Sequence, residues 1–404
     1  MILFQIQVLV LCFLVIAHLV RVVWDVPVEH NFFTTMIQVP IEKQRFCTLT
    51  ITESCNLNCP YCYEHHKSDR AMSIDLAVKI AEQELFSQND YEYVKFQFFG
   101  GEPFIEFETI RALVEHIKKH EYPKLYSFEI TTNGTLLTNE IKKWLIENKD
   151  LVYCFLSLDG TREMHNINRS NSFDAIDLSF FSKNYPNCQV KMTVSEKTLP
   201  NLFDGVKFCY DNGFQVFWNL GYGINWSNQE NAEILSRELK KLIDFHLKTP
   251  NITPSAMLSD PISKIVYQKE GGFTQSWCAT GLQMVAYSID GKKYPCQFFS
   301  PVTSGEKAIE LGNIEIKLDI PDDKLDEKCR SCVIRAVCPT CYGANYYSTG
   351  NLYKKDDNLC ALMKIILKAR SFFLAEKWKQ GNFGLGLDDE KLMLKAIVMI
   401  QNEL

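Results

Sequence analysis

Fifteen cysteines occur among the 404 residues of this chain, and most of them fall into two groups. An odd number of cysteines excludes complete internal pairing, and the chain is far too long for a small disulfide scaffold. Metal ligation, redox chemistry or simple burial must therefore account for many of the thiols. The formal net charge is −6, so the composition gives no sign of sequence-independent binding to nucleic acid.

Strand-like and helix-like stretches alternate between residues 47 and 250. The expected strands are Cys47–Thr52, Tyr93–Phe98, Ser127–Ile130, Val152–Leu158, Gln189–Val194 and Gln215–Asn219. Helical patterns follow them near 74–86, 107–119, 139–147, 173–181, 202–211 and 232–247. Short connections between such units require parallel strands joined by crossover helices. We therefore predict an α/β fold, a partial (β/α)6 TIM-like barrel with its chemistry at the carboxyl ends of the strands.

The predicted domains follow changes in periodicity and in cysteine density. The barrel is expected at 40–250, a cysteine-rich domain at 251–364, and closing helices within 365–404. Residues 1–24 form a separate apolar segment, and no charged side chain occurs before Arg21. Three interpretations of this segment stay open: a membrane anchor at residues 1–20 that leaves the body cytoplasmic, a packed helix, or an incorrect start ahead of Met36.

The first cysteine group follows the first predicted strand. Cys55, Cys59 and Cys62 have the spacing C-x3-C-x2-C. Three thiolates on one short loop can hold three irons of a [4Fe–4S] cluster and leave the fourth iron open to another ligand. A zinc site completed by His65 or His66 is the alternative.

The second predicted strand ends in Gly100-Gly101-Glu102-Pro103. Together with the three cysteines, this segment resembles the radical S-adenosylmethionine (SAM) superfamily over about residues 46–250. The resemblance implies that a [4Fe–4S] cluster on the three cysteines binds SAM. Reduction of SAM would then give a 5′-deoxyadenosyl radical that takes a hydrogen atom from the substrate. Such clusters are sensitive to oxidation, so a reducing cytoplasm is expected.

The same resemblance assigns SAM-binding roles to residues at the strand ends. Gly100 and Gly101 would let the backbone approach the methionine part of SAM, and Glu102 would bind its ammonium group. The other positions implied to line or grip SAM are Tyr61 near the adenine, Pro103, Asn133 of a Thr-Asn-Gly turn, and Ser157 with Arg169 at the carboxylate. An arginine can bind a carboxylate through two charged hydrogen bonds.

The second cysteine group lies in the C-terminal third. Its members are Cys278, Cys296, Cys329, Cys332, Cys338, Cys341 and Cys360. Their order resembles the SPASM domain, which carries auxiliary [4Fe–4S] clusters, although Cys338 and Cys341 are one residue closer than usual. Two zinc ribbons are the alternative. A catalytic base cannot be selected from the sequence.

The resemblance also divides these cysteines between one or two auxiliary clusters. Cys329, Cys332, Cys338 and Cys360 would hold one cluster. Cys278, Cys296 and Cys341 would hold a second cluster with only three thiolates, which leaves an iron on which a substrate thiolate could bind. Cys47, Cys154, Cys188 and Cys209 are interpreted as small buried apolar residues, and Cys12 lies in the apolar segment.

SPASM-type members mostly modify peptides and proteins. We therefore predict a maturase that acts on a ribosomally made peptide and forms a thioether or another crosslink. Formylglycine formation, as in anaerobic sulfatase-maturating enzymes, is the alternative, although Gln297 stands where those enzymes carry a carboxylate. A non-catalytic iron–sulfur electron carrier is the alternative outside enzymes.

The expected partners follow from the predicted activity. A peptide or protein substrate is expected together with a reductase, flavodoxin or ferredoxin as electron donor. Related maturases often carry an N-terminal leader-binding module, for which the stretch before the first predicted strand is short. We therefore expect a separate leader-binding protein, or leader recognition by the barrel and SPASM surface.

Overall fold

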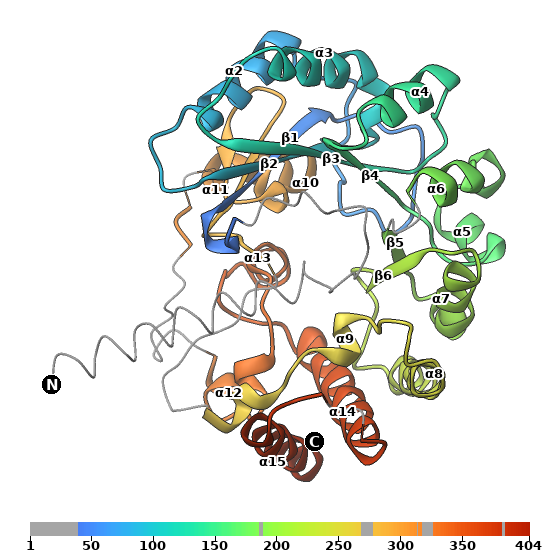
Figure 1. The fold of residues 1–404 in the computed structure, drawn as a ribbon. Helices are drawn as coiled ribbons and strands as arrows, with labels where there is room; N and C mark the ends of the chain where they lie inside the picture. The colour runs from blue at the N-terminus through green and yellow to red at the C-terminus, as the bar shows by residue number, and fades with distance from the viewer. Residues whose placement is uncertain (1–38, 186–188, 268–277, 313, 317–325, 382–383) are drawn as a thin grey trace, which may run out of the picture.

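The computed structural model describes residues 39–185, 189–267, 278–312, 314–316, 326–381 and 384–404. The apolar N-terminal segment, Cys12 and Cys188 lie outside the described residues, so the predictions made for them stay untested. Within the described part, the chain forms a parallel sheet with helices on its outer face above a helical C-terminal region (Figure 1).

The sheet is built in the order β4-β3-β2-β1-β7-β8. Its strands are β1 (Gln44–Thr52), β2 (Tyr93–Gly100), β3 (Leu125–Thr132), β4 (Val152–Leu156), β7 (Met284–Tyr287) and β8 (Lys293–Tyr294). All neighbours pair in parallel except β7 with β8. A second parallel pair is formed by β5 (Gln189–Val194) and β6 (Gln215–Leu220). A single bridge between Ser157 and Lys191 continues the sheet from β4 to β5.

Helices follow the strands as expected for β/α units. They are α2 (Ile74–Leu85), α3 (Phe107–Lys118), α4 (Asn139–Glu147), α5 (Arg162–Asn168), α6 (Leu178–Asn184), α7 (Leu202–Asp211) and α8 (Gln229–Lys248). The Ser73 hydroxyl caps α2 by accepting from the Leu76 N–H, which satisfies one of the four free N–H groups at a helix start. The α/β fold predicted from the sequence is confirmed, and α5 is an additional helix between β4 and α6.

The core lies between the sheet and its outer helices. Phe96, Phe98 and Phe128 are almost fully buried, and their rings stack at 5.5 Å between centroids. Cys47, Cys154 and Cys209 are also buried, as predicted for cysteines that serve as small apolar side chains. This rigid layer fixes the carboxyl ends of β1 to β4, where the first cysteine group begins.

The C-terminal region is attached to the sheet through β7, which pairs with β1. A buried network supports the pairing, since Arg45 lies 3.2 Å from a Glu84 carboxylate oxygen and the Tyr287 hydroxyl donates to Glu84 at 2.6 Å. Two short elements precede β7, namely α9 (Ala256–Ser259) and η5 (Ser263–Tyr267). The short helices α10 (Pro301–Ser304), α11 (Ala308–Leu311), α12 (Glu327–Arg330) and α13 (Tyr342–Thr349) follow it and lead to the long helices α14 (Asp357–Lys379) and α15 (Leu387–Glu403).

The helices α14 and α15 form a second apolar core with η5. Ile265, Leu367, Ala396 and Ile400 are among its most buried members. Among the helices that the structure describes, none combines the length and apolarity needed to cross a bilayer.

Candidate active site

The three cysteines of the first group lie on a loop of residues 53–63 at the carboxyl end of β1, which we call the cysteine loop. Cys55, Cys59 and Cys62 are each partly buried, and no described cysteine forms a disulfide. Burial raises the pKa of Cys59 to about 11, and the nearby Cys62 and Cys55 thiols contribute to the rise. The loop therefore brings its three thiols together, as the sequence predicts.

Three side-chain contacts hold the cysteine loop against the neighbouring strand ends. The Asn133 amide donates to Asn56 at 2.9 Å, so the turn after β3 grips the loop between Cys55 and Cys59. The Asn58 N–H donates to the Ser170 hydroxyl at 3.0 Å, and the Tyr61 hydroxyl donates to Asp159 at 2.6 Å. The loop is thus fixed to the turn after β3 and, at two points on either side of α5, to the crossover between β4 and β5.

Ser170 is held in an unusual backbone conformation. With Asn171 it has a φ near +55°, and these are the only residues other than glycine with positive φ in the described part of the chain. Left-handed φ values are costly for residues with a Cβ and tend to persist where function needs them. This conformation presents the Ser170 hydroxyl to the cysteine loop.

The two glycines after β2 pack directly against the backbone that enters the cysteine loop. A Cβ on Gly100, whose φ is +136°, would lie 1.9 Å from the Thr52 carbonyl oxygen, and one on Gly101 would lie 2.2 Å from the Ser54 oxygen. Only glycine fits at either position. Both glycines are thus required for packing against the cysteine loop. Their expected role in letting the backbone approach SAM stays a prediction.

Glu102 joins the ends of β2 and β3. Its carboxylate accepts from the Thr132 hydroxyl at 2.7 Å, the Asn133 N–H at 2.7 Å and the Phe104 N–H at 3.2 Å, just after Pro103 opens a short 3-10 helix. Burial raises its pKa, and these hydrogen bonds oppose the rise. A carboxylate has about four acceptor positions, so capacity for one more donor remains.

Arg169 and Ser157 lie on either side of α5. Ser157 is almost buried, and its N–H donates to the Thr132 carbonyl at 2.8 Å. Arg169 forms an ion pair with Asp159, with Nε 2.9 Å from one carboxylate oxygen and Nη2 donating to the other at 3.2 Å. Its guanidinium also faces the Tyr61 ring at 5.6 Å. Two predicted SAM contacts, Arg169 and Tyr61, therefore meet at Asp159.

No role was assigned to Asp159 from the sequence. The carboxylate is fully buried and also accepts from the Thr193 N–H at the end of β5, at 2.8 Å. Burial lowers the pKa of His165 to about 4, and this neutral imidazole accepts the Asp159 N–H at Nδ1. The only available signal was its position after a predicted strand, next to a glycine.

Three C-terminal cysteines, Cys278, Cys296 and Cys341, come together in space and form the inner cysteine set. Burial raises the pKa of Cys296, and the neighbouring Cys278 and Cys341 thiols raise it further. Burial raises the pKa of Cys341 to about 11, against opposing hydrogen bonds from the Ala344 N–H and the Tyr222 hydroxyl. The Cys278 thiol lies 2.9 Å from the Thr280 hydroxyl.

The other four C-terminal cysteines, Cys329, Cys332, Cys338 and Cys360, form the outer cysteine set. Burial raises the pKa of Cys329, to which the nearby Cys338 and Cys332 thiols add. Cys360 lies in the first turn of α14 and interacts with Lys328 beside Cys329. Lys355, only 3% exposed, donates to the Cys338 carbonyl at 2.7 Å and to its sulfur at 3.2 Å.

Aromatic side chains join the cysteine loop to the inner cysteine set. Tyr63, Tyr222 and Phe298 form this junction aromatic cluster, in which the Tyr63 and Phe298 rings stack at 5.1 Å and Tyr222 packs edge-on against both. The Tyr63 hydroxyl accepts a hydrogen bond from Gln297. The first and second cysteine groups are therefore linked through residues that directly follow Cys62 and Cys296.

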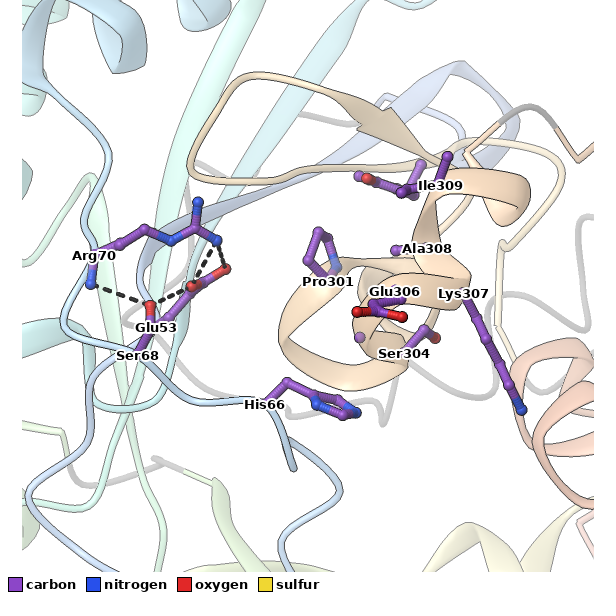
Figure 2. A pocket seen from close by; sticks show the side chains of 12 residues that line it. Glu53, His66, Ser68, Arg70, Pro301, Ser304, Glu306, Lys307, Ala308 and Ile309 are labelled. Carbon is purple, nitrogen blue, oxygen red and sulfur yellow. Dashed lines mark hydrogen bonds and ion pairs between the residues drawn. The ribbon is translucent and has the colours of Figure 1, made fainter.

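A cavity of about 700 Å³ lies on the junction between the barrel and the C-terminal region (Figure 2). Glu53, Ser68 and Arg70 form its barrel side, where Glu53 accepts from the Ser68 hydroxyl at 2.6 Å and from Arg70 at 3.1 Å. Glu306 and Lys307 belong to its opposite wall. None of the predicted SAM contacts lines this cavity.

The donor chemistry of the cysteine loop fits an iron–sulfur cluster. Three free thiols lie on one loop that is held at three points by hydrogen bonds, which suits a cluster with one open iron. Among the described histidine, cysteine, aspartate and glutamate side chains, no group of three is arranged to hold a single metal ion.

Comparison with known proteins agrees with this fold. Residues 49–178 match the model of the Radical SAM superfamily. Residues 49–178, which include the cysteine loop and the strands β2 to β4, therefore carry a Radical SAM domain. Named relatives of this domain are enzymes, among them a GTP 3′,8-cyclase of Clostridium perfringens, which is 26% identical over 216 residues.

Within the superfamily the chain is related to sulfatase-maturating enzymes. It is 36% identical over 140 residues to the cysteine-type anaerobic sulfatase-maturating enzyme of Clostridium perfringens, which covers 33% of this chain and 36% of that protein. It is 23% identical over 381 residues to the radical SAM cyclopropyl synthase TigE of Paramaledivibacter caminithermalis, covering 81% and 74%.

The fold also resembles a solved structure of native anSMEcpe with bound AdoMet. The TM-score is 0.61 at 17% identity, over 89% of this chain and 100% of the other. This likeness shows a shared fold, which includes the cysteine-rich C-terminal region. The sequence match to the clostridial maturase, in contrast, spans only about a third of that enzyme's length.

Proposed function

We propose that this enzyme modifies a ribosomally made peptide by hydrogen abstraction and forms a thioether or another crosslink. The observation that carries the proposal is the inner cysteine set, where Cys278, Cys296 and Cys341 meet next to the junction aromatic cluster. With SAM on the cysteine loop, the bound cluster would supply a 5′-deoxyadenosyl radical. A peptide bound between the cysteine loop and the inner cysteine set would be exposed both to the radical and to the auxiliary cluster.

The chain's own residues would bind and orient SAM. Arg169 carries the charge for the SAM carboxylate, and the remaining acceptor position on Glu102 suits the SAM ammonium group. Tyr61, fixed by Asp159, is expected beside the adenine. Gly100, Gly101, Pro103, Asn133 and Ser157 complete the proposed binding edge.

Joining a substrate thiol to a substrate carbon removes two hydrogens. One leaves as a hydrogen atom to the 5′-deoxyadenosyl carbon, and the other leaves as a proton, which frees one electron. An auxiliary cluster on the inner cysteine set would accept that electron, and its three thiolates leave one ligand position for the substrate sulfur. The outer cysteine set would hold a further cluster.

The central test is SAM cleavage after anaerobic reconstitution with iron and sulfide, followed by chemical reduction. We expect 5′-deoxyadenosine from the wild-type chain and none from C55A. C209A removes a buried cysteine that we assign to packing, so it should keep both iron and activity. Intact clusters without SAM cleavage would favour the electron-carrier alternative and overturn the proposal.

The auxiliary clusters are tested by iron content. Three [4Fe–4S] clusters correspond to about 12 irons per chain. C278A and C338A should each lose about four irons and keep the SAM-binding cluster, which electron paramagnetic resonance with and without SAM can identify. A wild-type content of about four irons would contradict the assignment of both C-terminal sets.

Formylglycine formation is the second candidate, favoured by the identity to the clostridial maturase. Gln297, whose amide bonds to Tyr63, is uncharged and unsuited to act as a base. Incubation with a cysteine peptide from a sulfatase and mass spectrometry separates the two. Conversion of cysteine to formylglycine would replace the crosslinking proposal, whereas loss of two hydrogens from a cysteine-containing precursor peptide would support it.

A further inference from the structure

Asp159 contacts more segments of the candidate site than any single predicted SAM contact. Its carboxylate, which has no exposed surface, meets Tyr61 of the cysteine loop, Arg169 after α5 and the Thr193 N–H at the end of β5. Its own N–H donates to the buried His165 imidazole. One side chain thus joins the cysteine loop to the ends of two strands.

The geometry determines how Arg169 is presented. Asp159 accepts one Nη2 hydrogen of the guanidinium and lies 2.9 Å from Nε as an ion-pair partner. A guanidinium has five N–H donors in one plane, so the other edge keeps donors for a second carboxylate. The Tyr61 ring lies 5.6 Å from the guanidinium carbon and restricts its plane. The arginine is therefore oriented before any ligand arrives.

The segment around α5 also contains an exposed ion pair, with which the buried pair of Asp159 and Arg169 can be compared. Arg162 and Asp174 also form a two-point ion pair, but both side chains are more than 60% exposed. Solvent-exposed pairs of this kind contribute little to stability or to the shape of a site. The buried pair, in contrast, is costly unless each partner is fully satisfied, which favours a fixed geometry.

We propose that Asp159 is a positioning residue for SAM, which orients Arg169 toward the SAM carboxylate and Tyr61 toward the adenine. The proposal rests on the SAM-binding function proposed above. Asp159 does not itself touch SAM. Its effect should therefore appear in SAM affinity through Arg169 and Tyr61, with little effect on the rate of the bound complex.

The first test compares D159N with the wild type and with D174N after anaerobic reconstitution. The dissociation constant of SAM is measured by equilibrium dialysis, together with KM and kcat for 5′-deoxyadenosine formation. We expect D159N to raise the dissociation constant and KM at least tenfold, with kcat within about threefold of the wild type. D174N should match the wild type in each quantity.

The second test is a double-mutant cycle with R169M. If Asp159 acts through Arg169, most of the loss caused by D159N should vanish in the R169M background. The double variant D159N/R169M removes both buried charges and leaves neither partner unpaired. Its SAM affinity can therefore be compared with that of R169M even if D159N alone loses iron or has a low melting temperature. Iron content and melting temperature are recorded for every variant.

The outcomes separate this inference from the proposed function. A wild-type chain that binds no SAM overturns the proposed function and this inference with it. A wild-type chain that binds SAM while D159N binds it equally well overturns the positioning role alone. Losses that multiply fully in D159N/R169M would contradict action through Arg169.

Discussion

Tyr63 stacks on Phe298 with ring centroids 5.1 Å apart and planes inclined by 11°. Tyr63 directly follows Cys62, and Phe298 lies two residues after Cys296. A Cβ on Gly343, near the start of α13, would lie 2.6 Å from Phe298, so α13 also packs closely on this ring. The stack therefore fixes the distance between the cysteine loop and the inner cysteine set.

Replacing Phe298 with alanine should loosen this junction. We expect a loss of about 2–3 kcal/mol in the free energy of unfolding, because a partly buried aromatic ring and its stacking are removed. Hydrogen exchange should rise in residues 61–66 and 297–304, measured by mass spectrometry. F203A removes a comparable ring that packs on Phe245 and should leave exchange in both segments unchanged; equal protection in F298A would contradict the role of the stack.

Gly100 allows the sharpest test of the turn after β2. In G100A the new Cβ would meet the Thr52 carbonyl at 1.9 Å at a φ of +136°, so the backbone must shift. We expect more than about 3 kcal/mol of destabilisation and loss of SAM cleavage. The measurements are the melting temperature and 5′-deoxyadenosine formation.

Gly213 provides the matched control for this substitution. It also has a positive φ, +80°, but nothing lies within 4 Å of an added Cβ. G213A should therefore cost only about 1–2 kcal/mol of backbone strain and keep SAM cleavage. Equal losses of stability in G100A and G213A would show that the backbone conformation, and not the close contact with β1, is the reason why Gly100 cannot be replaced.

His246 predicts how stability depends on pH. Burial lowers its pKa to about 4, whereas an unfolded histidine titrates near about 6.5. Between these values the unfolded chain binds a proton that the folded chain does not, so the free energy of unfolding falls as the pH drops from about 6.5 to 4. The lowered pKa of His165 also makes the free energy of unfolding fall at low pH. The contribution of His246 is therefore measured as the difference between a His246 variant and the wild type.

H246L removes this titration. Relative to the wild type, the free energy of unfolding of H246L should rise by about 3 kcal/mol between pH 7 and pH 4. Denaturant titrations at several pH values measure the difference. A difference that does not change with pH for H246L would contradict the buried neutral imidazole.

The fold was readable from the sequence because its strands and helices are strongly periodic. The predicted ranges 139–147 and 202–211 coincide with α4 and α7. The bounds of each predicted strand differ from those of an observed strand by three residues or fewer. β7 and β8 were missed because each is short, at Met284–Tyr287 and Lys293–Tyr294. Their place beside β1 depends on long-range pairing, which local patterns do not report.

The candidate site was predictable where chemistry depends on spacing along the chain. Cys55, Cys59 and Cys62 share one loop, so their spacing already showed that they meet. Asp159 was missed because its role comes from contacts with Arg169, on the far side of α5, and with Tyr61 and Thr193, which are 98 and 34 residues away along the chain. Partnerships of this kind depend on how the strand ends converge.

The contact between Lys355 and Cys338 leads to a prediction about the reduction potential at the outer cysteine set. Its buried ammonium donates to the Cys338 sulfur at 3.2 Å, and a positive charge with a hydrogen bond at a ligand sulfur stabilises the reduced form of a cluster. K355M should therefore make the reduction potential of the cluster proposed for the outer cysteine set more negative, by about 60 mV if the lost contact is worth about 1.5 kcal/mol.

The measurement is a redox titration followed by electron paramagnetic resonance, with iron content determined on the same samples. K354M removes the exposed neighbouring lysine and should leave all potentials unchanged, because solvent screens an exposed charge. K355R should retain most of the wild-type potential, since it keeps both the charge and the donor. A K355M protein with full iron content and an unshifted potential would show that Lys355 only packs the loop around Cys338.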